Sequence, residues 1–323
     1  AASDVYKRQI YRPIPRDRDQ VSSNYDGALL DFMKLLIPGT KQFQEYSEDF
    51  KDYKWINLAG IKIDRTFTQT SGKEVWLEQA QFIVDNLTDE VIDEAFKQLP
   101  PEVQNEASEE IKQMLKARRG KLVTFAGKYF DHLSQLVVLT ATDKDDHIEI
   151  VRGDNFTEIS ISRIKDGEVQ PPFKTRRIER KKTKEIWVYA LDDDDNIVVK
   201  GRPNNPIRIR IIGGQNNDTY TIENGRRVKV YDHKTKPNTI VRKGGANINF
   251  ADNYRYNIYR YDKYIDGVTS FFPGVGFNPD DGMKVGITIS SADRGFKNDP
   301  FQVKHTLSGG YFFATQGFDI QYT

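Results

Sequence analysis

Two groups of acidic residues in this 323-residue chain have the types and spacing that a divalent metal ion requires. The first is the pair Asp17 and Asp19, at the end of a proline-bracketed extended segment. Magnesium in proteins is commonly held by one or two carboxylates together with substrate phosphates, so this pair is a candidate for phosphoryl-transfer chemistry. The alternating Arg16 and Arg18 could instead pair with both aspartates. The phosphate-cradling glycine-rich loop and the catalytic Asp–Asn loop of kinases do not occur in the sequence.

The second group lies in turns rich in aspartate and asparagine. The sequence IGGQNNDTYTI, at residues 212–222, resembles the calcium-binding nonapeptide of RTX-type β-rolls. Calcium takes about six to eight oxygen ligands, so neighbouring turns would have to stack to complete its cage. Alternatively, these residues only form turns, because Asp and Asn tolerate left-handed backbone and hydrogen-bond within their own turn. The candidate calcium ligands are Asp192, Asp193, Asp194, Asp195, Asn217 and Asp218.

These turns belong to a degenerate internal repeat, in which an acidic or amide turn precedes a short strand. Its three copies align as residues 142–150, 191–199 and 213–221. The intervals between copies are unequal, so the repeat is not a regular array. Period-two runs punctuated by Gly, Asn and Asp extend over residues 138–250 and predict an all-β domain, either a sandwich or a solenoid-like stack.

The region that precedes this domain is predicted to be mixed and mainly helical, over residues 10–137. Apolar residues recur there at helical spacing, and Thr88 and Ser108 are suitable N-cap residues. Residues 1–9 resemble a non-native leader and are excluded from the predicted fold. The N-terminal region is therefore expected to support the β domain with a small helical bundle.

Composition narrows the possible functions. The chain has no cysteine, which excludes disulfides, thiolate catalysis and zinc–thiolate sites. Its net charge of +1 gives no reason to expect nucleic acid as a partner. No stretch approaches the ~20 apolar residues of a membrane-spanning helix. A basic run at residues 174–184 is predicted to be a solvated strand face, with a lipopolysaccharide or nucleic-acid patch as the alternative.

The C-terminal residues 251–323 predict the first strands of a transmembrane β-barrel. From Gly282 onward, apolar and polar residues alternate in segments of about ten residues, as in barrel strands. Tyrosines in residues 253–264 are predicted to form an interfacial aromatic girdle. Membrane lipid and the remainder of its own barrel are the expected partners. The candidate lipid-facing residues are Met283, Val285, Ile287 and Ile289.

Several segments together resemble one family. These are RPIPRDRDQ with the following YDG, the helical middle, IGGQNNDTY and PGVGFNPDDGMKVGITIS. They resemble the C-terminal region of large Gram-negative outer-membrane proteins that end in a surface-antigen-type barrel, akin to outer-membrane assembly factors. Many of those proteins carry an N-terminal calcineurin-like metallophosphoesterase. The GNHE motif of that enzyme is missing from this sequence, so its catalytic residues cannot be assigned here.

The sequence thus predicts an α+β protein with a helical N-terminal region, an all-β middle domain and the start of a truncated transmembrane β-barrel. The preferred function is anchoring, assembly or surface display at the outer membrane, with a periplasmic region. One alternative is part of a metal-dependent phosphoryl-transfer or phosphoesterase enzyme with most of its catalytic motifs upstream. The other is a β binding module stabilised by Ca²⁺ or another divalent metal.

Overall fold

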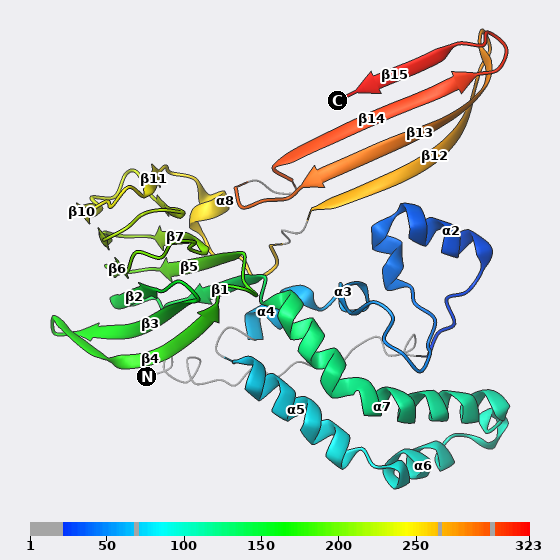
Figure 1. Cartoon of the computed structure of the whole chain (residues 1–323), viewed down its shortest axis with the longest axis horizontal. Coiled ribbons are helices and arrows are strands. Elements are labelled where there is room, and N and C mark those ends of the chain that lie inside the picture. Colours follow the sequence, from blue (N-terminus) through cyan, green and yellow to red (C-terminus); the bar gives the residue numbers. More distant parts are fainter. Residues whose placement is uncertain (1–21, 68–70, 264–266, 298–300) are drawn as a thin grey trace, which may run out of the picture.

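The computed structural model describes residues 22–67, 71–263, 267–297 and 301–323. The chain has a helical N-terminal part, two facing sheets in the middle and a separate four-stranded sheet at its C-terminal end (Figure 1). The mixed α+β class predicted from the sequence is confirmed. Among the described helices, none has both the length and the apolar character needed to cross a membrane.

The N-terminal part of the described chain consists mainly of helices. Thr88 caps α6 as predicted, because its side chain accepts a hydrogen bond from the Val91 amide. The longest helix, α7, begins one turn earlier than predicted: Asn105 is the N-cap, and it forms a capping box with Ser108. The helices are α2 (Ala28–Leu36), η1 (Pro38–Gln42), α3 (Tyr53–Ile56), α4 (Ile61–Phe67), α5 (Lys73–Asn86), α6 (Asp89–Lys97), η2 (Pro101–Val103) and α7 (Glu106–Leu133).

The middle of the chain, residues 136–250, is a two-sheet β-solenoid. The chain passes from one sheet to the other and back, so that each pair of strands forms one rung stacked on the last. The first sheet is parallel throughout: β1 (Leu136–Thr140), β5 (Glu185–Leu191), β7 (Arg208–Gly214), β9 (Val228–Asp232) and β11 (Asn247–Phe250). The second has β10 (Thr239–Arg242), β8 (Thr219–Ile222), β6 (Asn196–Lys200), β2 (Asp146–Arg152), β3 (Phe156–Lys165) and β4 (Glu168–Glu179) in that order.

The solenoid core lies between the two sheets and is built from β-branched residues in register. Ile148 pairs with Ile197, and Ile197 with Tyr220, so the same inward position repeats from rung to rung. All three side chains are completely buried. Period-two alternation places every second residue inside, which is why the sequence pattern identified these strands. Of the two architectures left open by the sequence, the structure has the solenoid.

The antiparallel hairpin β3–β4 is an insertion into the first rung, and it accounts for the unequal repeat intervals. The first two copies of the repeat are aligned correctly, since Asp143 bridges to Asp192 and Ile148 pairs with Ile197. The third copy was displaced by one residue. Leu191 pairs with Gly214, where the sequence alignment had matched it to Gly213.

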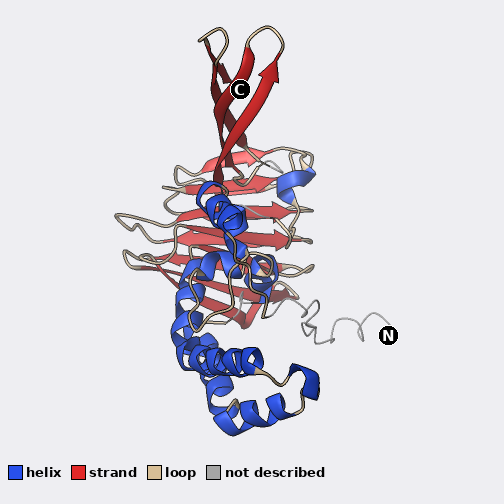
Figure 2. Ribbon diagram, turned by 90° about the vertical axis from the view of Figure 1, so that its right-hand side faces the viewer, coloured by secondary structure: helices blue, strands red, loops and turns tan. Residues whose placement is uncertain are grey.

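The C-terminal sheet is an antiparallel meander that projects away from the solenoid (Figures 1 and 2). Its strands pair in chain order, and each of the first three is ten or more residues long. They are β12 (Val268–Asn278), β13 (Gly282–Asp293), β14 (Val303–Phe312) and β15 (Phe318–Tyr322).

The tyrosine-rich segment before this sheet packs in part on the solenoid, so Tyr256 and Tyr259 do not contribute to the predicted aromatic girdle. Tyr254 and Tyr261 are exposed, and Tyr264 lies outside the described residues. Residues 254–257 form the short helix α8 (Tyr254–Asn257), and Tyr256 is buried with its ring 5.4 Å from that of Tyr231. Tyr259 packs edge-on against Tyr189. The first strand of the sheet begins at Val268, later than the predicted boundary at residue 251.

Candidate functional site

The acidic turns of the solenoid stack into a ladder of side-chain hydrogen bonds. The Asp146 amide donates to Asp195 Oδ1 at 2.8 Å, and the Asp195 amide donates to Asp218 Oδ1 at 3.0 Å. The Asp218 amide continues the series with Asn238 Oδ1 at 2.8 Å. Each side chain in this inner ladder reaches back to the rung before it. The strand ends are thereby held together where the sheet hydrogen bonds stop.

A second ladder runs beside the first, on the exposed side of the turns, in the opposite direction. The Asp194 amide donates to Asp145 Oδ1 at 3.1 Å, and the Asn217 amide donates to Asp194 Oδ1 at 3.0 Å. Here each side chain reaches forward to the next rung. Four of the six predicted calcium ligands, Asp194, Asp195, Asn217 and Asp218, are therefore brought together, in two ladders of opposite sense.

The inner ladder places carboxyl groups away from water. Asp146, Asp195, Asp218 and Asp232 are each at most 2% exposed. Burial, followed by the neighbouring Asp218, raises the pKa of Asp195 to about 10. Burial and the neighbouring Asp232 raise the pKa of Asp218 to about 8. Burial also raises the pKa of Asp146 and of Asp232. At neutral pH, Asp195 and Asp218 are therefore protonated, which reduces the repulsion within the ladder.

Tyr220 and Gly213 complete the buried acid cluster. The Tyr220 hydroxyl donates to Asp232 Oδ2 at 2.6 Å from inside the core. A Cβ at Gly213 would collide with this hydroxyl and with the carboxylates of Asp218 and Asp232. Gly213 is thus required for space, not for its backbone conformation. The following Gly214 does need its conformation, since its φ is 108°.

The remaining predicted ligands, Asp192 and Asp193, shape the turn itself. Asp193 and Asn216 occupy left-handed backbone in successive turns, with φ of 65° and 67°. The Asn216 side-chain amide donates to Asp192 Oδ1 at 3.2 Å across the two turns. These contacts correspond to the turn-forming role that was the alternative to calcium binding.

In the part of the chain that the structure describes, no three His, Asp or Glu side chains converge to hold a metal ion. In both ladders, one carboxylate oxygen of each linking aspartate already accepts a backbone N–H. Asp17 and Asp19, the predicted magnesium pair, lie outside the described residues.

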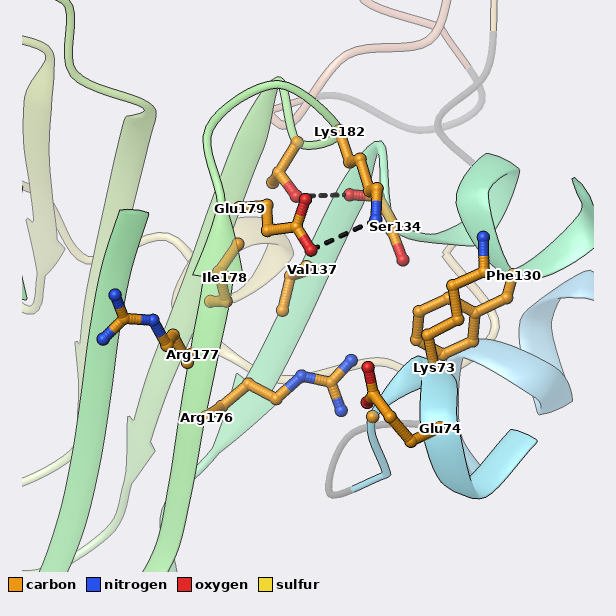
Figure 3. A pocket seen from close by; sticks show the side chains of 12 residues that line it. Lys73, Glu74, Phe130, Ser134, Val137, Arg176, Arg177, Ile178, Glu179 and Lys182 are labelled. Carbon is orange, nitrogen blue, oxygen red and sulfur yellow. Dashed lines mark hydrogen bonds and ion pairs between the residues drawn. The ribbon is translucent and has the colours of Figure 1, made fainter. Parts of the chain in front are cut away.

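A pocket of about 280 Å³ lies between β4, α5 and the end of α7 (Figure 3). Its polar groups mostly pair with one another. Lys182 contacts Glu179 at 3.1 Å, and the Thr183 hydroxyl donates to the Ser134 carbonyl at 2.8 Å. Arg176 comes from the predicted basic run, and its guanidinium lies 5.8 Å from the Phe130 ring. The pocket therefore lies at the contact between the helices and the solenoid. Its polar groups do not form an arrangement of catalytic groups.

The C-terminal sheet presents an apolar face, which is the second candidate site. Cross-strand partners share a face, and Val285 pairs with both Val275 and Tyr311. Ile289, on the same face, is half-buried. The other apolar side chains here are exposed: Phe271 37%, Val275 80%, Phe277 74%, Met283 56%, Val285 46%, Ile287 47%, Leu307 45%, Phe318 79%, Ile320 81% and Tyr322 65%.

The opposite face of this sheet is mostly polar or small, although Phe272 and Phe312 also lie on it, beside Thr288 and Lys284. Lys284 forms an ion pair with Asp319 at 2.5 Å, across β14. Thr288 pairs with Ser308, and Gly286 pairs with both Gly274 and Gly310. The predicted alternation from Gly282 onward therefore extends over most of the sheet, with Phe272 and Phe312 as exceptions.

Sequence reasoning missed Asp146, Asp232, Asn238 and Tyr220 as members of the ladder and its cluster. Asp146 and Asp195 are separated by 49 residues, and Asp195 and Asp218 by 23. An alignment anchored on the inward-facing Ile148, Ile197 and Tyr220 would have revealed this register.

Comparisons of the chain with protein-family models, curated proteins and solved structures found no match, so its own geometry is the evidence for its function.

Proposed function

We propose that the C-terminal sheet lies in the outer membrane as the first strands of a transmembrane β-barrel, with the solenoid and helices as its periplasmic part. The observation that carries this proposal is the exposed apolar face of β12–β15, set against an opposite face that is mostly polar or small. Soluble proteins rarely expose a contiguous apolar surface of this extent. In a barrel, one face of the sheet contacts lipid and the other faces a polar lumen. This arrangement explains why one face of β12–β15 is apolar and the other mostly polar.

Strand length supports the same proposal. A membrane-crossing strand needs about nine to eleven residues when tilted. β12, β13 and β14 have 11, 12 and 10 residues. The four glycines Gly274, Gly276, Gly286 and Gly310 fall on the polar face, where a lumen leaves room for other side chains or water.

The edges of the sheet would have to pair if it lies in lipid. Within the described residues, β12 pairs only with β13, and β15 only with β14. Unpaired backbone groups cost several kcal/mol each in hydrocarbon, so in a membrane both edges would pair with further strands, such as those of a second copy of the chain. Further strands would close the barrel, and the role of the assembled protein would be anchoring or display of the solenoid at the membrane.

Single-cysteine labelling tests this proposal cleanly, because the chain contains no cysteine. Ile287→Cys and Thr288→Cys place an environment-sensitive fluorophore on adjacent positions of opposite faces. After refolding of the full chain with phospholipid vesicles, the label at residue 287 should shift to shorter wavelength and be quenched by brominated acyl chains. The label at residue 288 should be quenched much less.

Ile320→Cys and Gln321→Cys repeat the comparison on β15. Equal quenching on both faces, or no quenching at either, would refute insertion with this orientation. Quenching by a second labelled copy instead of by lipid would mean that the apolar face is an interface between copies of the chain.

A further inference from the structure

A pocket of about 510 Å³ lies where the solenoid meets the turn between β13 and β14. Lys184, Arg208, Arg210 and Lys229 line it from the first sheet of the solenoid. The turn supplies Asp293 and Phe296, and Phe296 is buried against the aromatic outer face of that sheet. The pocket therefore lies at the end of the C-terminal sheet that is attached to the solenoid.

The acidic residues of this pocket are already engaged. Glu185 accepts a hydrogen bond from Trp187 at 2.7 Å and pairs with Arg208 at 3.2 Å and with Arg210. Asp293 Oδ1 accepts the Gly295 amide at 3.2 Å. The negative charge of Glu185 is therefore balanced largely by Arg208 and Arg210.

The lysines of the pocket remain without an acidic partner. Neither Lys184 nor Lys229 forms an ion pair with a described side chain, and Lys184 is exposed. Burial lowers the pKa of Lys229, and the positive charges of Arg210, Arg208 and Lys297 lower it further. Lys229 is thus surrounded by cations, and Glu185 is already paired with the arginines. The pocket therefore has a local excess of positive charge, which favours the binding of an anion.

We propose that this cationic pocket binds the phosphate of an anionic phospholipid headgroup at the periplasmic surface of the membrane. The inference rests on the proposed membrane location of β12–β15. If those strands cross the hydrocarbon, their solenoid-side turn lies at headgroup level, and the pocket beside Phe296 faces the headgroups. Basic residues at that level attract anionic lipids. The guanidinium of Arg208 adds a planar donor group suited to phosphate oxygens.

The test compares two double variants of the full chain in vesicle flotation. Lys184→Glu with Lys229→Glu reverses two charges in the pocket. Lys165→Glu with Lys243→Glu makes the same charge change at exposed positions elsewhere on the solenoid. Vesicles of phosphatidylcholine alone are compared with vesicles that also contain phosphatidylglycerol.

The unmodified chain should bind phosphatidylglycerol vesicles more tightly than phosphatidylcholine vesicles. The pocket variant should lose more than roughly 25-fold of its affinity for the anionic vesicles, because each cation removed costs about fivefold and each glutamate adds a negative charge. The control variant should keep most of it. Circular dichroism melts verify folding, and Lys184→Gln with Lys229→Gln provides a second pair that should lose affinity in the same direction.

The outcomes separate this inference from the proposed function. Equal binding to both vesicle types by all variants would overturn the pocket assignment and leave membrane insertion intact. Binding to neither type would overturn the proposed function itself. Binding of inorganic phosphate that is lost in the pocket variant, together with equal binding of the unmodified chain to both vesicle types, would overturn the lipid assignment in favour of free phosphate.

Discussion

The ring of Phe296 lies 4.6 Å from the ring of Tyr231, and this contact holds the turn after β13 on the outer face of the solenoid. Trp187 meets the same ring edge-on at 4.9 Å, and Arg210 lies over it at 4.9 Å. The buried Phe296 side chain thus joins the C-terminal sheet to the solenoid, and Lys297 over the Tyr231 ring adds to the same contact.

Phe296→Ala should loosen this joint. Removal of a buried phenylalanine costs about 3 to 5 kcal/mol, and Trp187 would become accessible to solvent. We expect a lower unfolding temperature and stronger acrylamide quenching of tryptophan fluorescence. Phe313→Ala, at a side chain that is 55% exposed, is the matched control and should change neither. Unchanged quenching in Phe296→Ala would show that the contact does not hold the two parts together.

The buried acids make the stability of the solenoid depend on pH. Asp195 and Asp218 keep their protons in the fold up to pH about 10 and about 8, whereas in the unfolded chain they lose them near pH 4. Their contribution is therefore fully present below about pH 4 and is lost as pH rises toward the folded values.

Stability should accordingly fall as pH rises from about 5 to about 8, because the fold keeps protons at these two carboxyls that the unfolded chain has lost. Chemical denaturation at several pH values measures this slope. Asp195→Asn, which cannot ionise, should flatten the slope, while Asp166→Asn in an exposed turn should not. A slope that is identical in all three proteins would mean that Asp195 ionises normally.

Gly213→Ala should destabilise the solenoid, because the new methyl group would displace the Asp218 and Asp232 carboxylates and the Tyr220 hydroxyl. Overpacking of this kind typically costs about 1 to 3 kcal/mol, and displaced buried hydrogen bonds add to that. Gly120→Ala is the control: a Cβ there meets no atom within 4 Å, and alanine favours the helix by about 1 kcal/mol. The two variants should shift the unfolding midpoint in opposite directions, and a shift in the same direction would contradict this account.

Calcium should not raise the melting temperature of the chain. The ladder oxygens of Asp194, Asp195 and Asp218 are engaged by backbone amides, and the buried pair is protonated at neutral pH. Melting curves in millimolar calcium and in chelator should coincide. A calcium-dependent rise that disappears in Asp194→Asn would restore the calcium-binding interpretation of these turns.

Patterns that are local in sequence predicted structure well. The alternation from Met283 to Ile289 identified one face of a strand, because side chains of a strand alternate regardless of what surrounds them. Thr88 was identified as a cap for the same reason: its hydrogen bond reaches only Val91.

Features that depend on distant partners were missed or displaced. The Asp195–Asp218 contact requires knowledge of which rungs stack, and the β3–β4 insertion hides their spacing. The tyrosines near residue 256 have the composition of a strand, yet Tyr256 is drawn into a short helix where it covers Tyr231. Tertiary burial overrides local preference at such positions.

The opposite directions of the two ladders bear on how this solenoid can change in evolution. Thr142 closes the inner ladder at one end by donating to Asp146, and Asn238 closes it at the other by donating to the His233 carbonyl. A duplicated 23-residue unit inserted between the rungs of Asp195 and Asp218 would bring its own donor and acceptor to both ladders. Such a duplication lengthens the array without creating a new end, whereas deletion of a terminal rung removes a cap that no internal rung can replace.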